Sequence, residues 1–180
     1  MKDILPHDEL KALLLDAGVV EEKDILLAEE RFQSEGGAFS ESILWYNLVS
    51  EEELGKLMAD ALHFPFVVLE QKQIVDEVLR IVPEIVAKKH HIIAFALDGE
   101  GLHLAMADPR DVEMRNFFEK KTGLPVRAYF SMERDVENAL TLYRAEVTEA
   151  FEHIILSDIE KAEQGKEEAN PPIIRIVDIL

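Results

Sequence analysis

The sequence has no cysteine among its 180 residues, which excludes a disulfide scaffold and any thiolate nucleophile or metal ligand. It is also short of basic residues, with 19 Lys and Arg against 37 Asp and Glu and a formal net charge of -18. Because nucleic acids and anionic lipid surfaces are bound by clustered Lys and Arg, this charge argues against both as partners. Hydrophobic residues make up 48% of the chain, as is typical of a globular protein rather than a disordered one.

Long apolar runs and catalytic motifs are absent as well. The N-terminus lacks the apolar segment of a signal peptide, and no run approaches the roughly 18 apolar residues of a membrane-spanning helix. The glycines form no phosphate-binding loop, and neither a GxSxG nucleophile motif nor an HxxxH metal motif occurs. We therefore expect a cytoplasmic chain without direct membrane insertion, catalytic residues, metal or cofactor of its own.

The acidic charge is unevenly distributed along the chain. Residues 21–60 hold 11 acidic and 3 basic residues, and residues 145–170 hold 8 and 2, whereas residues 80–134 hold 8 acidic and 9 basic residues. Separate modules within one chain would produce this asymmetry, and so would an ordinary solvated acidic face.

Residues 1–62 predict a helical subdomain made of two duplicated helix pairs. In the first pair, one apolar helix face is followed by Gly18, a residue suited to the left-handed turn that ends a helix. About 29 residues later Asn47 takes the place of Gly18, and Ser50 with Glu53 forms the pattern of a capping box. The first face consists of Leu10, Leu13, Leu14 and Ala17.

Residues 63–144 predict a second subdomain with the order β-β-α-β-α, so that the whole chain is expected to be an α+β protein. Strands at 92–97 and 102–107 flank a hairpin turn, and a third strand covers 126–130. We expect Asp108 to cap the helix between the second and third strands, and Ser131 to cap a last helix that reaches Tyr143. The helices are expected on one side of the sheet.

The remaining residues predict an amphipathic helix at 145–163, a linker at 164–172 and a short apolar segment at 173–180. This last segment is either the first element of a truncated downstream region or a final element that folds back on the preceding domain.

The order and spacing of several short motifs resemble the N-terminal domain of the type II secretion and type IV pilus assembly ATPases. These motifs are the doubled helix pair followed by residues 64–67, 82–84, 104–109, 122–124 and 173–177. The resemblance implies that the segment beginning at 173 leads into an ATPase core, so that ATP and Mg²⁺ would serve only that missing region. It also implies a hexameric full-length protein, whereas the present chain is expected to be monomeric.

The resemblance leaves two functions open. One is a docking and regulatory domain that joins the ATPase to the cytoplasmic domain of an inner-membrane platform protein, which would make it peripheral to that membrane. The other is a cyclic di-GMP-binding domain, as in the subgroup whose two tandem motifs begin Arg-Leu-Gly. This chain has Glu9-Leu10-Lys11 and Ala38-Phe39-Ser40 at those positions, so both arginines and both first glycines are missing. An enzyme carried by this chain alone is the third alternative, and no group of residues supports it.

Two sets of residues are candidates for binding. The apolar positions of the ligand motif are retained, and an ordinary helical core would require the same residues: Leu10, Leu14, Leu15, Gly18, Phe39, Ile43 and Leu48. The acidic start of the last helix of the second pair is the candidate surface for a basic protein partner: Glu51, Glu52 and Glu53.

Overall fold

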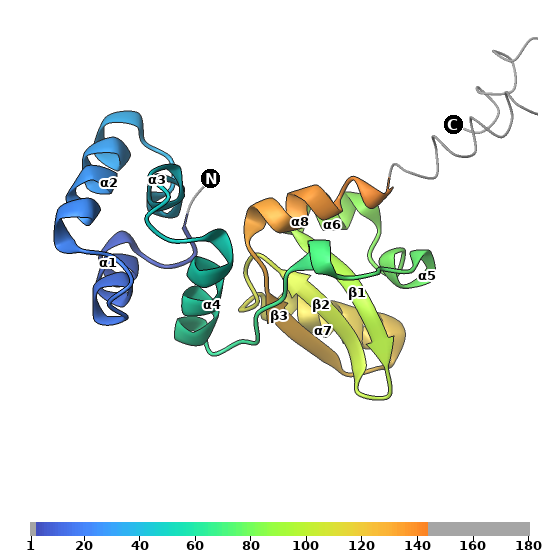
Figure 1. Ribbon diagram of the computed structural model, residues 1–180. Helices are drawn as coiled ribbons and strands as arrows, with labels where there is room; N and C mark the ends of the chain where they lie inside the picture. The colour runs from blue at the N-terminus through green and yellow to red at the C-terminus, as the bar shows by residue number, and fades with distance from the viewer. Residues whose placement is uncertain (1–2, 144–180) are drawn as a thin grey trace, which may run out of the picture. The chain divides into compact units, whose positions relative to one another are not determined.

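A computed structural model describes residues 3–143 of the chain (Figure 1). The chain divides into two compact units, Met1–Ala139 and Leu140–Leu180. The first unit contains the first predicted subdomain and residues 63–139 of the second. The helix expected at 145–163, the linker at 164–172 and the apolar segment at 173–180 lie outside the described residues.

Four helices form the N-terminal part of the first unit: α1 (His7–Asp16), α2 (Glu22–Glu35), α3 (Phe39–Trp45) and α4 (Glu51–Leu62). Each helix contributes apolar side chains to one shared core, and burial of these side chains holds the two helix pairs together. The core side chains that these four helices bury to at most 3% exposure are Leu10, Leu14, Ile25, Ala28, Phe39, Ile43, Leu54, Met58 and Ala59.

The turns confirm the duplicated arrangement of the helix pairs. Gly18 follows α1 with a φ of 65°, and Asn47 follows α3 with a φ of 50°, so both residues adopt the left-handed conformation at equivalent points. Ser50 accepts a hydrogen bond from the backbone N–H of Glu53, and the Glu53 carboxylate accepts one from the backbone N–H of Ser50. This reciprocal capping box begins α4 where it was predicted.

The second subdomain is built around three strands: β1 (Ile92–Asp98), β2 (Gly101–Met106) and β3 (Val126–Phe130). β1 and β2 form the predicted hairpin, and β3 lies parallel to β2 because α7 (Val112–Thr122) carries the chain back between them. The remaining elements are η1 (Leu69–Gln71), α5 (Asp76–Leu79), α6 (Glu84–His90) and α8 (Glu133–Ala139). The architecture is therefore the α+β fold expected, with a mixed three-stranded sheet.

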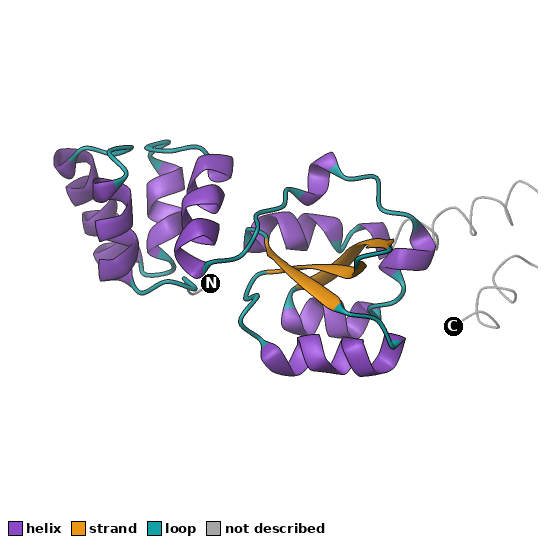
Figure 2. Ribbon diagram, turned by 90° about the horizontal axis from the view of Figure 1, so that it is seen from below, coloured by secondary structure: helices purple, strands orange, loops and turns teal. Residues whose placement is uncertain are grey.

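The prediction that the helices pack on one side of the sheet was wrong. Every residue of the central strand β2 is buried, which requires cover on both faces of the sheet. Figure 2 shows helices above and below the strands.

Two predicted helix starts were also wrong. Asp111, and not Asp108, caps α7, because the Asp108 carboxylate accepts the backbone N–H of Arg110 within the preceding turn. α8 begins at Glu133, two residues after Ser131, and ends at Ala139, and Leu142 and Tyr143 are helical again after a turn at residues 140 and 141. The buried Ser131 hydroxyl donates to the Asp135 carboxylate, at 2.9 Å, four residues farther along the chain.

Apolar contacts cross the predicted boundary at residues 62 and 63. Phe130 and Met132 belong to the same buried cluster as the helices α1–α4, and Phe66 packs against it. Phe66 also forms a single parallel bridge to Phe130 at the edge of the sheet. Within residues 3–143, no helix is both long enough and apolar enough to cross a bilayer.

Candidate functional site

The apolar positions of the expected ligand motif lie inside the protein. The four side chains at Leu10, Leu14, Phe39 and Ile43 have no exposed surface. Leu15 and Leu48 are half-buried against the same core, and only Gly18 is exposed, at its turn. These leucines, the isoleucine and the phenylalanine therefore fill the helical core, and a ligand would reach most of them only if that core opened.

The three acidic residues at the start of α4 have different partners. Glu53 is part of the capping box, and the hydrogen bond from the Ser50 hydroxyl holds the pKa of the Glu53 carboxyl below its ordinary value. Glu52 forms an ion pair with Lys56 at 2.6 Å, one turn along the same helix. Glu51 and Glu52, but not Glu53, line a groove that the sequence did not predict.

This acidic groove lies where α4 meets η1 and α8, and its volume is about 220 Å³. Four carboxylates line it, together with apolar side chains and two amides. The lining residues are Glu51, Glu52, Glu70 and Asp135, with Phe66, Val68, Met132, Gln71 and Asn138. Acidic walls beside an apolar surface suit a Lys or Arg side chain, whose aliphatic stem packs while its charged end pairs.

Asp135 has a structural role within the groove. Its carboxylate accepts the backbone N–H groups of Leu69 at 2.6 Å and of Glu70 at 3.3 Å, and the hydroxyl of Ser131 at 2.9 Å. These bonds hold η1 against α8, so Asp135 fixes the shape of the acidic groove.

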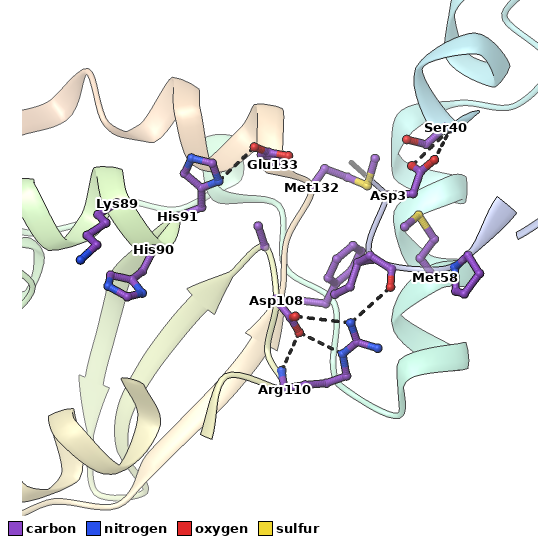
Figure 3. Close-up of a pocket in the computed structure, with 14 residues that line it drawn as sticks. Asp3, Ser40, Met58, Lys89, His90, His91, Asp108, Arg110, Met132 and Glu133 are labelled. Atoms are coloured by element: carbon purple, nitrogen blue, oxygen red, sulfur yellow. Dashed lines mark hydrogen bonds and ion pairs between the residues drawn. The ribbon is translucent and has the colours of Figure 1, made fainter. Parts of the chain in front are cut away.

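A larger cavity of about 750 Å³ lies between the N-terminal segment, α4 and the sheet (Figure 3). Asp3 accepts the backbone N–H groups of Phe39 and Ser40 and so caps α3. Arg110 bonds the Asp108 carboxylate and the backbone carbonyl of Ile4, and the Asp108 bond raises the pKa of the Arg110 guanidinium. The charges of Asp3 and Arg110 are thus engaged by the protein itself.

His91 and Glu133 line one edge of this cavity, and Glu137 lies beside them outside its lining. His91 Nδ1 lies 3.0 Å from Glu133 Oε1, and potential ligand atoms of His91, Glu133 and Glu137 all lie within 4.8 Å of one another. The sequence shows only part of this cluster, namely the helical i, i+4 spacing of the two glutamates. His91 is more than 40 positions away, and only the fold brings it to them.

The geometry can be compared with proteins already known. The sequence profile of the MshEN domain matches residues 62–150. The type IV pilus assembly ATPase PilB of Thermus thermophilus is 33% identical over 122 residues, which cover 67% of this chain and 14% of that protein. PilB of Myxococcus xanthus is 21% identical over 182 residues, which cover 95% of this chain and 32% of that protein.

The fold has a counterpart among solved structures. A structure of MshE with cdg, cyclic di-GMP, superimposes with a TM-score of 0.57 and 20% identity, covering 74% of this chain and 97% of the other. At that identity the likeness concerns the fold alone. The chain spans about a seventh and a third of the lengths of the two PilB relatives.

Proposed function

Because this chain belongs to the MshEN-type N-terminal domains of the type IV pilus and type II secretion ATPases, we propose that it is a non-catalytic docking and regulatory module. In this proposal it couples the ATPase to the cytoplasmic domain of an inner-membrane platform protein. The module then works in the cytoplasm, at the membrane surface, and reaches the membrane through its protein partner.

The acidic groove is the observation that carries this proposal. Glu51, Glu52 and Glu70 place carboxylates around the apolar side chains of Phe66 and Val68. A basic residue of the partner, with an apolar neighbour, matches that combination of charge and shape. Because the groove includes residues from both subdomains, a partner bound there would also restrain them relative to each other.

A binding measurement with the platform domain tests the groove. The double variant Glu51→Gln, Glu52→Gln removes two carboxylates and leaves the structural Asp135 in place. We expect its affinity for the platform domain to fall about tenfold, and the salt dependence of binding to weaken. Isothermal titration calorimetry at two salt concentrations measures both effects.

The duplicated helix pairs provide a matched control. Glu22→Gln with Asp24→Asn neutralises two acids at the start of α2, the helix equivalent to α4 in the first pair. This control leaves the affinity unchanged if the groove is the contact. Equal effects of the two double variants would indicate a general charge effect, and unchanged binding by the Glu51 and Glu52 variant would contradict the proposal.

Cyclic di-GMP binding is a second candidate function, and the likeness of the fold to MshE with its ligand supports it. The chain lacks the motif arginines, and Glu9 occupies one of their positions. Four apolar motif positions are also buried completely. Calorimetric titration of the chain with cyclic di-GMP tests this candidate, and the absence of heat at high micromolar ligand would exclude it.

ATP hydrolysis belongs, in this proposal, to parts of the whole protein outside these 180 residues. The PilB relatives support this assignment, because the chain aligns with only 14% and 32% of their lengths. ATP, Mg²⁺ and hexamer formation are assigned to the same parts, and the present chain is taken as a monomer. The gene sequence that follows the codon for Leu180 tests this assignment, which requires a phosphate-binding loop there.

A further inference from the structure

We propose that His91, Glu133 and Glu137 form a binding site for a divalent first-row transition-metal ion. This site is separate from the acidic groove, and its existence depends on neither docking nor cyclic di-GMP binding. Three potential ligand atoms, one from each residue, lie within 4.8 Å of one another. The histidine comes from the end of α6, and both glutamates come from α8.

The backbone positions these three side chains so that their ligand atoms lie close together. Glu133 and Glu137 are four residues apart on α8, so their carboxylates lie on the same helix face. His91 ends α6 in the left-handed conformation, with a φ of 50°, and its carbonyl accepts the backbone N–H of Ala107 at 3.1 Å. The residue is therefore held between the end of α6 and the end of β2, and Figure 3 shows its ring directed at Glu133.

Among residues 3–143, no Lys or Arg side chain forms an ion pair with the two carboxylates of the cluster. Glu133 has an ion pair with His91 at 3.0 Å, and that pair is charged only when the imidazole is protonated. Within residues 3–143, the Glu137 carboxylate has no hydrogen bond or ion pair, and the Glu133 carboxylate pairs only with His91. Two carboxylates carry excess negative charge even beside a protonated imidazole, and a divalent cation would reduce it.

The ligand set indicates the class of metal. Mg²⁺ and Ca²⁺ prefer oxygen ligands alone, whereas an imidazole with carboxylates suits Zn²⁺, Co²⁺, Mn²⁺ or Ni²⁺. Such ligands lie about 2.0–2.2 Å from the metal, so that ligand atoms of a tetrahedral ion are roughly 3.4 Å apart. The exposed Glu137 side chain would close the remaining separation by changing its rotamer.

Zn²⁺ and Co²⁺ titrations of the untagged 180-residue chain test the proposal. We expect one ion per chain, bound at micromolar concentration, with a rise in the melting temperature because the metal binds only the folded state. The absorption spectrum of bound Co²⁺ should lack thiolate bands, since the chain has no cysteine. Failure to bind either ion at 1 mM would overturn the proposal.

Substitutions at the cluster locate the ion. Glu137→Gln should weaken Zn²⁺ binding at least tenfold with little effect on folding, because the side chain is exposed and its carboxylate has no hydrogen bond or ion pair within residues 3–143. His91→Asn removes the imidazole and keeps a residue that tolerates the left-handed conformation. It should weaken binding to a similar degree.

Two control variants separate this site from adventitious surface binding. His63 also ends a helix in the left-handed conformation, with a φ of 59°, so His63→Asn matches the histidine substitution. Glu113→Gln matches the glutamate substitution on an exposed helix position. Both controls should bind Zn²⁺ as the unchanged chain does. If either control weakens binding as much as Glu137→Gln, or if Glu137→Gln and His91→Asn leave binding unchanged, the assignment is wrong.

Discussion

The carboxylate of Asp135 accepts a hydrogen bond from the backbone N–H of Leu69 at 2.6 Å, although the two residues are 66 positions apart. This bond ties the segment that follows the helical subdomain to the last described helix of the first unit. It also sets one wall of the acidic groove, so stability and the proposed docking surface depend on the same side chain.

Replacement of Asp135 by Ala should therefore destabilise the protein. The substitution leaves the N–H of the buried Leu69 without its acceptor, and a hydrogen bond to a charged group contributes about 2 kcal/mol. Urea unfolding of the variant should show that loss in the free energy of unfolding. Asp60→Ala removes an exposed carboxylate without a hydrogen bond within residues 3–143 and should change stability little. Equal stability of the two variants would contradict the role of Asp135.

Gly55→Ala should destabilise the protein even though Ala is the better helix former. A Cβ atom at position 55 would lie less than 3.0 Å from ring carbons of Phe66, and 3.3 Å from Cγ of Met132. Ala gains about 1 kcal/mol over Gly in helix propensity, whereas overpacking a core costs typically 1–3 kcal/mol. We expect the Gly55→Ala variant to have a lower melting temperature than the unchanged chain. A rise would mean that Phe66 moves aside at little cost.

Ser50→Ala should weaken the start of α4. The substitution removes the hydroxyl that accepts the backbone N–H of Glu53 and donates to its carboxylate, and loss of such a cap costs about 1 kcal/mol. Chemical unfolding measures the loss. Ser50→Thr retains a hydroxyl that both accepts and donates and should recover most of the stability, whereas a Thr variant as unstable as Ser50→Ala would contradict the capping role.

Asp98 should contribute to the acid sensitivity of the fold. The backbone N–H of Glu100, and next the His103 ring, hold the pKa of the Asp98 carboxyl below its ordinary value. A lowered pKa in the folded state stabilises the protein above the unfolded value of about 3.9, and this contribution is lost as the pH falls through the folded value.

Unfolding measurements at pH 5 and pH 3 test this contribution. The unchanged chain should lose more stability than Asp98→Asn over that interval, because the variant has no carboxylate to protonate at this position. Asp60→Asn serves as the reference and should behave as the unchanged chain does. If all three proteins lost the same stability between pH 5 and pH 3, the hydrogen bonds of Asp98 would not contribute to the acid sensitivity of the fold.

Local chemistry explains why much of the fold could be predicted from the sequence. Gly18 and Asn47 adopt the expected left-handed turns, and the Ser50 capping box begins α4, because each of these features depends on a few adjacent residues. The third strand, Val126–Phe130, has the predicted bounds for the same reason. The cap of α7 was misplaced by three residues, since Asp108 and Asp111 are equally good capping residues and neighbouring bonds decide between them.

The candidate sites could not be predicted in this way. The acidic groove adds Glu70 and Asp135 to Glu51 and Glu52, and the metal-site candidate joins His91 to Glu133 and Glu137. The sequence by itself determined the helices, the turns, the hairpin and the excess of acidic charge, because these follow from short-range bonding and composition. Only the tertiary structure decided which carboxylates meet and which apolar positions are buried, because such contacts join residues that are distant along the chain.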